Sequence, residues 1–378
     1  MERRYISRLD TKISLLGFGC MRLPRCNAET QDIDYKAAES LVDHAIAAGV
    51  NYFDTAWMYH GGKSEAFIGH ALRKYPRESF FLADKLPIWS VETPEDVDRI
   101  FTEQLKRCQV EYFDFYLAHN LNRDNYEIFE RNGVHALLRE KQKEGRIKHL
   151  GFSFHDNTDL LRKIVTEYTW DFAQIQLNYL DWEGLDAKGQ YAALVEQNLP
   201  VFVMEPVRGG ALATLNDTGL ALLREVNAEA SPASWAIRFA ASLPGVAVVL
   251  SGMSAMEQLV DNLKTMEEFR PLDEGERAVL SKVAMEYRAS GAIPCTACRY
   301  CMDCPAGVDI PRVFSAYNTY RTTDSKLRFF VDYRSLRESE QAHNCIECGQ
   351  CQEHCPQSID IPGTMRMIGE TAVALEKS

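Results

Sequence analysis

Residues 49–59, Gly49-Val50-Asn51-Tyr52-Phe53-Asp54-Thr55-Ala56-Trp57-Met58-Tyr59, contain a short apolar run that is followed by an aspartate and a tyrosine. The segment 52–55, which ends this run and includes Asp54, has the length of a buried strand, and an amphipathic stretch follows it at 65–74. A strand followed by a helix is the repeating element of parallel α/β folds, because a parallel crossover needs a helix-length connection. The stretch therefore predicts one strand–helix unit.

The same unit recurs along residues 1–270, which hold eight of them in a row. We expect strands at 15–19, 52–55, 80–83, 113–118, 149–153, 172–177, 201–204 and 246–250. We expect helices at 37–48, 65–74, 94–108, 125–144, 159–167, 190–197, 232–241 and 255–266. Eight units in about 250 residues favour a closed (β/α)8 TIM barrel of the α/β class. A doubly wound open sheet is the alternative, but no Gly-x-Gly-x-x-Gly turn follows the first strand.

Polar residues follow three consecutive strands of this barrel. Asp54, Lys85 and His119 come at the strand ends, and Tyr59 lies on the loop after Asp54. The C-terminal ends of barrel strands carry the reacting groups, so we expect these four side chains to meet. Each alone could be structural: a helix cap, an exposed strand end, a core histidine or a packing aromatic. All four at consecutive strand ends favour an active site.

The four side chains suit the reduction of a carbonyl by hydride, which leaves an alkoxide that must be protonated. Tyr59 is a suitable acid, although a free phenol has a pKa of about 10. A neighbouring Lys85 ammonium favours the phenolate and so eases proton donation. Asp54 would pair with Lys85, and His119 would orient and polarise the carbonyl oxygen.

The stretch 49–59 resembles the signature of the aldo-keto reductases, and Lys85 and His119 fall where that family keeps its other two catalytic residues. Glu65 resembles the helix start that follows the tyrosine loop in the family. The resemblance covers residues 8 to about 268 and implies a nicotinamide dinucleotide, NADP(H) or NAD(H), across the barrel mouth. It also implies a small-molecule carbonyl or alcohol as substrate.

The resemblance further implies the residues that hold this cofactor. The positions are Ser153, Gln174, Met204, Gly252, Ser254, Gln258 and Asn262. Three positions depart from the family. Gln258 stands where NADPH-specific members carry an arginine, and Gly252 replaces a common lysine, so charge that would pair with a 2′-phosphate is absent. Phe154 stands where many members have an asparagine that touches the nicotinamide amide.

Eight of the eleven cysteines form two runs near the C-terminus, each followed by a proline. The runs are Cys295, Cys298, Cys301 and Cys304, and Cys345, Cys348, Cys351 and Cys355. This spacing with a trailing proline is typical of bacterial 4Fe–4S sites. Zinc usually takes two separated Cys-x-x-Cys pairs, and disulfides need an oxidising compartment, so both are weaker alternatives. We therefore expect two 4Fe–4S clusters.

The 40 residues between the runs show helical patterns at 312–320 and 326–338 and no strand alternation. This resembles the helical ferredoxin domains of electron-transfer enzymes. In two-cluster ferredoxins the fourth cysteine of each run binds the other cluster. The resemblance thus implies one cluster on Cys295, Cys298, Cys301 and Cys355, and another on Cys345, Cys348, Cys351 and Cys304. We expect a barrel at 1–270, a linker helix at 271–292 and a small helical ferredoxin-like iron–sulfur domain at 293–378.

The composition of the chain argues against nucleic-acid-binding and membrane-spanning proteins. The net charge of −12 argues against non-specific nucleic-acid binding, and no apolar run has the length of a membrane span. The N-terminus shows no secretory signal, so we expect a cytoplasmic enzyme. The clusters either pass electrons between an external carrier and the barrel or hold their domain together. The alternative function is an electron-transfer adaptor with a non-catalytic barrel, but the complete set of four barrel residues argues against it.

Overall fold

A computed structural model of the chain describes residues 1–27, 31–302 and 304–377. Eight parallel strands form a closed barrel, which confirms the predicted fold class. The strands are β3 (Leu16–Gly19), β4 (Tyr52–Asp54), β5 (Phe81–Pro87), β6 (Phe113–Leu121), β7 (Ile147–Phe154), β8 (Phe172–Gln176), β9 (Val201–Met204) and β10 (Val246–Gly252). They pair in chain order, and β10 closes the ring against β3.

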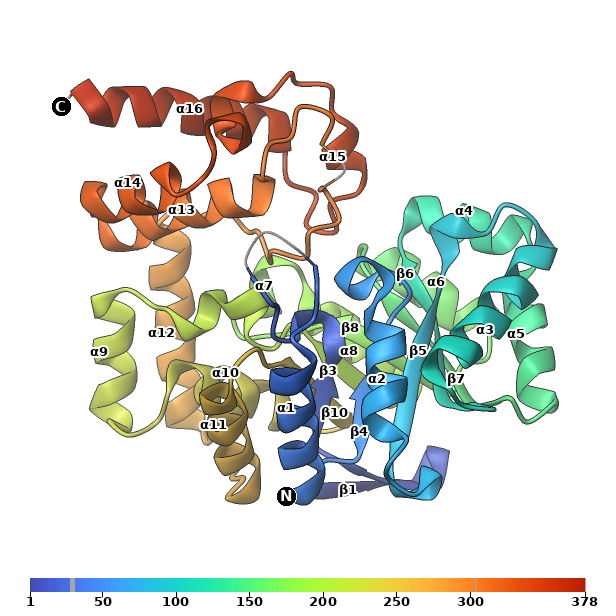
Figure 1. The fold of residues 1–378 in the computed structure, drawn as a ribbon. Helices are drawn as coiled ribbons and strands as arrows, with labels where there is room; N and C mark the ends of the chain where they lie inside the picture. The colour runs from blue at the N-terminus through green and yellow to red at the C-terminus, as the bar shows by residue number, and fades with distance from the viewer. Residues whose placement is uncertain (28–30, 303, 378) are drawn as a thin grey trace. The chain divides into compact units, whose positions relative to one another are not determined.

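Helices follow the strands and lie outside them (Figure 1). They are α1 (Tyr35–Ala47), α2 (Ser64–Leu72), α3 (Pro94–Cys108), α4 (Arg123–Arg131), α5 (Val134–Lys143), α6 (Thr158–Glu167), α7 (Asp181–Gly184), α8 (Ala187–Glu196), α10 (Pro232–Ala241) and α11 (Met256–Glu267). The single helix expected at 125–144 is wrong. Gly133 adopts a left-handed backbone with φ 59°, which ends α4 and starts α5 in a new direction.

A hairpin that the sequence pattern did not indicate closes one end of the barrel. It pairs β1 (Arg3–Ile6) with β2 (Thr11–Ser14) and leads directly into β3. Its Leu9 and Ile13 belong to one buried cluster with Tyr52, Phe115 and Phe202 from the strands. The hairpin therefore covers the N-terminal ends of the strands, and the C-terminal ends form the mouth.

By its internal contacts the chain divides into two units, Met1–Pro206 with Ser234–Leu272, and Val207–Ala233 with the residues from Asp273 onward. The second unit therefore includes the segment after β9, with η6 (Arg208–Ala213) and α9 (Asp217–Val226). It also contains α12 (Glu274–Ala289), where the sequence predicted a linker helix.

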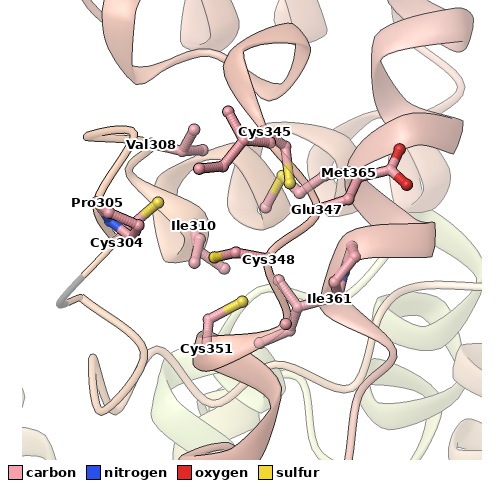
Figure 2. A pocket seen from close by; sticks show the side chains of 13 residues that line it. Cys304, Pro305, Val308, Ile310, Cys345, Glu347, Cys348, Cys351, Ile361 and Met365 are labelled. Carbon is pink, nitrogen blue, oxygen red and sulfur yellow. The ribbon is translucent and has the colours of Figure 1, made fainter.

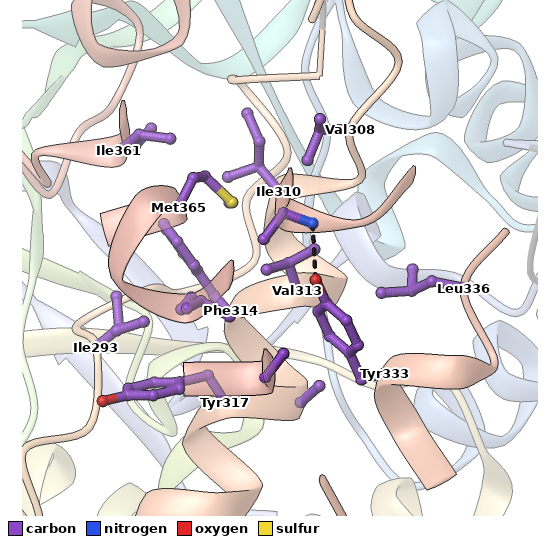
Figure 3. Packing of buried hydrophobic residues seen from close by; sticks show 14 of the residues in the cluster. Ile293, Val308, Ile310, Val313, Phe314, Tyr317, Tyr333, Leu336, Ile361 and Met365 are labelled. Carbon is purple, nitrogen blue, oxygen red and sulfur yellow. Dashed lines mark hydrogen bonds between the residues drawn. The ribbon is translucent and has the colours of Figure 1, made fainter. Parts of the chain in front are cut away.

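The remainder of the second unit is helical, as expected. It contains α13 (Ile310–Thr323), α14 (Lys326–Arg334), η7 (Glu338–Glu340), η8 (Ala342–Asn344), α15 (Gln350–Glu353) and α16 (Ile361–Lys377). Its core gathers Val313, Phe314 and Phe329 with Met365 and Ile368 of α16. Figure 3 shows this packing and the Tyr333 hydroxyl, which accepts a hydrogen bond of 3.0 Å from the backbone N–H of Ala342. None of the described helices is long and apolar enough to span a membrane.

Candidate functional site

The barrel mouth brings together the four residues predicted at the strand ends. Lys85 Nζ donates to Asp54 Oδ1 at 2.6 Å, to the carbonyl of Thr55 at 2.7 Å and to Tyr59 Oη at 3.2 Å. The Lys85 side chain is only 1% exposed and that of Asp54 4%. Because a buried ammonium is costly unless its N–H groups are satisfied, the three bonds fix Lys85 in one position beside the phenol.

His119 also lies beside the phenol. Its ring lies edge-on to the Tyr59 ring with centroids 6.2 Å apart, and the Trp89 ring is 5.1 Å away. His119 is 2% exposed. The mouth therefore brings a phenol close to an ammonium and to an imidazole, and an indole lies against the imidazole.

Burial sets the protonation states at the mouth. Burial raises the pKa of Tyr59 well above 10, and the charges of Asp54 and Glu205 raise it further. Burial therefore outweighs the Lys85 ammonium, whose influence the sequence reasoning had emphasised. Burial lowers the pKa of His119 well below 6.5, and Lys85 lowers it further. At neutral pH the site holds a protonated phenol and a neutral imidazole, which can act as proton donor and hydrogen-bond donor.

A buried polar network that sequence reasoning missed supports Lys85 from the outer face of β5. Gln104 Nε2 donates to the Lys85 carbonyl and to Glu65 Oε1, both at 2.9 Å. Arg107 donates to Glu65 Oε2 at 3.0 Å, and its guanidinium lies 3.9 Å from the centre of the Trp57 ring. Because Trp57 belongs to the loop between Asp54 and Tyr59, the network holds both the lysine and the tyrosine loop.

Asp84 completes this network. It precedes Lys85 on β5 and is fully buried, with Cys108 Sγ 3.6 Å from its Oδ2. Burial raises the pKa of Asp84 well above its usual range, and the neighbouring Glu65 raises it further. Two carboxyl groups this close cannot both ionise in a dry interior, so we assign the proton to Asp84.

The residues expected at the nicotinamide end lie on adjacent strand ends. Ser153 of β7 is paired in register with Gln174 of β8, and both are buried. Gln174 Nε2 lies 3.6 Å from the sulfur of Met204, at the end of β9. Among the described residues, Gln174 Oε1 has no hydrogen-bond partner although it is buried. A buried amide oxygen without a donor costs about 1–3 kcal/mol, so it fits a ligand that supplies an N–H group.

The residues of the eighth unit form bonds of their own. Gln258 Oε1 accepts from the backbone N–H of Ser254 at 2.7 Å, and Asn262 Nδ2 donates to Ser251 Oγ at 2.9 Å. Ser254 Oγ donates to the carbonyl of Arg22 at 2.7 Å. These contacts orient the loop after β10, where the resemblance implies the phosphate end of the dinucleotide.

Arg22 lies close against Gly252. A Cβ at position 252 would lie only 3.1 Å from the Arg22 side chain. Arg22 Nη2 also pairs with Glu205 Oε1 at 3.3 Å, a contact across 183 residues that no local pattern announces. The aliphatic part of the Arg22 side chain thus packs against Gly252, while its guanidinium binds Glu205.

The eight cysteines of the second unit line two small cavities. The first is lined by Cys295, Cys298, Cys301 and Cys355, and the second by Cys304, Cys345, Cys348 and Cys351. Figure 2 shows the second set around its cavity. Each cavity takes three thiols from one run and the fourth from the other, the grouping that the resemblance implied.

The cysteine loops suit a cluster better than a single ion. Four thiols around each cavity are the donor set of a 4Fe–4S cluster. Within the described ranges, no three His, Cys, Asp or Glu side chains converge closely enough to hold one metal ion. Ala297, Arg299 and Glu347 have positive φ, which turns the chain sharply between successive cysteines. The backbone N–H of Ala297 donates to Cys295 Sγ at 3.3 Å, a bond of the type that tunes cluster potentials.

Curated proteins resemble part of the chain. A probable aldo-keto reductase of Glycine max is 33% identical over 150 residues, which are 38% of this chain and 42% of that protein. An uncharacterized oxidoreductase of Bacillus subtilis is 23% identical over 76% of this chain and 99% of its own length. The NADH-specific methylglyoxal reductase of Escherichia coli is 26% identical over 48% of this chain and 60% of its own length. The chain thus spans less than two thirds of the Glycine max and Escherichia coli proteins.

Solved structures agree with the sequence relatives. The holo form of an aldo-keto reductase from Bacillus halodurans superposes with a TM-score of 0.60 at 26% identity, covering 75% of this chain and 96% of that one. The profile of the aldo/keto reductase family matches residues 15–284, and that of a 4Fe–4S dicluster domain matches residues 294–359. The chain therefore belongs to the aldo/keto reductase family and carries a 4Fe–4S dicluster domain that follows the reductase domain in sequence.

Proposed function

We propose that the barrel reduces a small-molecule carbonyl, or oxidises the matching alcohol, with NADH or NADPH. The observation that carries this proposal is the buried Lys85 ammonium, which binds Asp54 and the Tyr59 hydroxyl together. A lysine used only for stability would not need a phenol as its third partner. When bound, the dinucleotide supplies the hydride that adds to the carbonyl carbon.

The chain's own residues manage the proton. Tyr59 gives its phenolic proton to the carbonyl oxygen as negative charge develops there, and Lys85 stabilises the phenolate that remains. Asp54 keeps Lys85 in place through the 2.6 Å bond. His119, neutral at physiological pH, donates a hydrogen bond that orients the same oxygen. For alcohol oxidation the proton moves in the opposite direction.

Ser153, Gln174 and Met204 are the residues we propose for the nicotinamide end of the cofactor. Gly252, Ser254, Gln258 and Asn262 are those we propose for the phosphate end, on the loop and helix after β10. The partnerless Gln174 Oε1 supports the first group. Neither position 252 nor 258 carries a cation for a 2′-phosphate, so the titration described below decides between NADH and NADPH.

For the second unit we propose two 4Fe–4S clusters, one in each cysteine cavity. When bound, such a cluster holds and passes one electron at a time. We propose that the protein uses them to exchange electrons with an external one-electron carrier, in a reducing compartment such as the cytoplasm. The hydride of the dinucleotide already carries both electrons to the carbonyl, so electrons from the clusters would serve to regenerate the reduced dinucleotide. Each oxidised dinucleotide takes two electrons and one proton, so two one-electron transfers, joined by a two-electron relay such as a flavin, would be needed for each turnover.

The first experiment is a fluorescence titration of anaerobically prepared protein with NADH and with NADPH, followed by turnover with a panel of aldehydes and ketones. We expect saturable binding of at least one dinucleotide and its oxidation by at least one carbonyl. Binding without turnover across the panel would favour the electron-transfer adaptor. The absence of binding by either dinucleotide would overturn the proposal for the barrel.

The second experiment follows the clusters by stopped-flow absorbance. Chemically reduced protein is mixed anaerobically with NAD+ or NADP+ and, separately, with the carbonyl that gave turnover. If the clusters exchange electrons with the barrel, their absorbance recovers at the rate of turnover. Clusters that stay reduced on that timescale would assign them a structural role.

A further inference from the structure

Asn120, the residue directly after the candidate catalytic His119, has an unusual backbone. Its φ is 58°, in the left-handed region that asparagine tolerates better than most side chains. The register between β6 and β7 shifts between Ala118 and Leu121, so the strand bulges at this point. Bulges next to active sites commonly redirect a side chain, and strain of this kind persists where the surroundings fix it.

The surroundings fix Asn120 at both of its backbone groups. Its N–H donates to Ser153 Oγ at 2.8 Å. Its carbonyl accepts from Nδ2 of the buried Asn125 at 2.7 Å. The bulge is therefore attached to the same serine that the resemblance places at the nicotinamide.

The side chain of Asn120 lacks the partner that its burial demands. The residue is 8% exposed, and its Oδ1 has no hydrogen-bond partner among the described residues. Gln174 Oε1, on the strand at the other side of Ser153, is in the same condition. The two residues with unpaired amide oxygens thus lie on β6 and β8, the two strands that flank Ser153 on β7. Native interiors rarely leave such acceptors unpaired unless a ligand or water completes them.

We propose that Asn120 binds the carboxamide of the nicotinamide ring and shares this group with Gln174. The inference rests on the proposed use of a nicotinamide dinucleotide. A primary carboxamide carries two N–H groups on one nitrogen, which matches two acceptors that lack donors. The buried ring of Phe154 cannot form such a hydrogen bond. An acceptor from the neighbouring strand β6 would take its place.

The test uses Asn120→Gly, because glycine adopts positive φ without strain and preserves the bulge. Dissociation constants are measured by fluorescence titration of the full, cluster-loaded protein with three probes: the natural dinucleotide that binds wild type more tightly, its 3-acetylpyridine analogue and ADP-ribose. The analogue has a methyl ketone in place of the carboxamide, and ADP-ribose lacks the ring. We expect Asn120→Gly to weaken the natural dinucleotide about tenfold and the other two probes less than twofold.

Asn132→Ala is the matched control. It removes another buried asparagine, whose Nδ2 binds the carbonyls of Val91 and Ile128 and which lies outside the mouth. It should lower the melting temperature without changing any of the three dissociation constants. Asn120→Asp provides a second variant, which keeps an acceptor oxygen and should retain the preference for the carboxamide over the ketone.

The outcomes separate this inference from the proposal on which it rests. If the wild-type protein binds no nicotinamide dinucleotide, the proposed function is wrong, and so is the proposed role of Asn120. Wild-type binding that Asn120→Gly leaves unchanged would overturn the inference alone. Equal weakening of all three probes would also overturn it, because the loss would then come from the shape of the mouth.

Discussion

The barrel mouth and the cysteine loops differ in how much of each site the polypeptide builds by itself. Lys85 is fully buried, and its ammonium donates three hydrogen bonds to other groups of the chain. Of the cluster cysteines, Cys301 is buried, Cys348 is exposed and the others are half-buried, on loops with little helix or strand. The first site is assembled by packing. The second presents donors around cavities and depends on its cofactor to join them.

This difference has consequences for stability. The core of the second unit includes Val313, Phe314 and Met365, and several cysteines pack directly against it. If the unfolded chain cannot bind a metal centre, the free energy of binding that centre adds to the free energy of unfolding of the domain. We therefore expect the cysteine loops to lose order when the clusters are removed and the barrel mouth to keep its geometry.

Removing the Lys85 ammonium should produce the largest change in turnover, because this ammonium contacts the phenol that gives up the proton. Lys85→Met removes the group that stabilises the Tyr59 phenolate and leaves Asp54 buried without its cation. We expect kcat to fall by about 10²–10⁴-fold with little change in the dissociation constant of the dinucleotide. Steady-state kinetics and a fluorescence titration measure both. A kcat within threefold of wild type would show that Lys85 supports the fold and not the reaction.

Paired cysteine substitutions should break one cluster or both, depending on which cavity each residue lines. Cys301→Ser with Cys355→Ser removes two ligands from the first cavity only, so about four iron atoms per chain should remain. Cys301→Ser with Cys351→Ser damages both cavities, so almost no iron should remain. Iron and sulfide analysis of anaerobic protein distinguishes the two. Similar iron contents in both variants would show that the cavities do not define the ligand sets.

Arg107→Met should lower turnover by an intermediate amount, because Arg107 positions the tyrosine loop and does not itself take part in the reaction. The substitution removes the guanidinium that binds Glu65 and stacks on Trp57, so the tyrosine loop loses a support. We expect kcat to fall about tenfold, the dinucleotide affinity to hold and the melting temperature to drop. Arg107→Lys should restore part of kcat because it keeps the charge. Arg99→Met, an exposed arginine on the same helix bound to Asp96, is the control and should change nothing.

A change of pH between about 6 and 9 should have the smallest effect on kcat. Burial lowers the pKa of His119 below 6.5 and raises that of Tyr59 above 10. As pH rises from about 6 to 9, His119 therefore stays neutral and Tyr59 stays protonated, and kcat for carbonyl reduction should be nearly flat. A falling limb appears only above the ordinary tyrosine pKa, as the phenol ionises. A clear inflection near pH 6.5 that His119→Gln removes would contradict this assignment.

The sequence pattern was sufficient for the barrel and the strand-end residues. Parallel barrel strands are buried on both faces, so each reads as a continuous apolar run, and Asp54, Lys85 and His119 follow from where those runs end. Ser153 and Gln174 came from the resemblance of short segments to the aldo-keto reductases. These features are local, and a single chain records them.

Contacts between distant segments could not be predicted in this way. Arg22 and Glu205 lie 183 residues apart, and nothing near either residue indicates the other. Gln104 reads as an ordinary helix residue until α3 packs against β5 and places its amide between Glu65 and Lys85. The bulge at Asn120 depends on the hydrogen bond between its backbone N–H and Ser153, which is distant in sequence. The alternation of apolar and polar residues along β6 therefore gives no sign of it.

The most direct test of the central claim is Tyr59→Phe in the complete, cluster-loaded protein. The substitution removes one oxygen atom and keeps the ring that lies beside His119. If the phenol is the acid of a carbonyl reduction, dinucleotide binding should stay within about twofold while turnover falls by about 10²–10⁴-fold. Near-normal turnover of the same carbonyl by Tyr59→Phe would show that the barrel mouth does not work by the proposed chemistry.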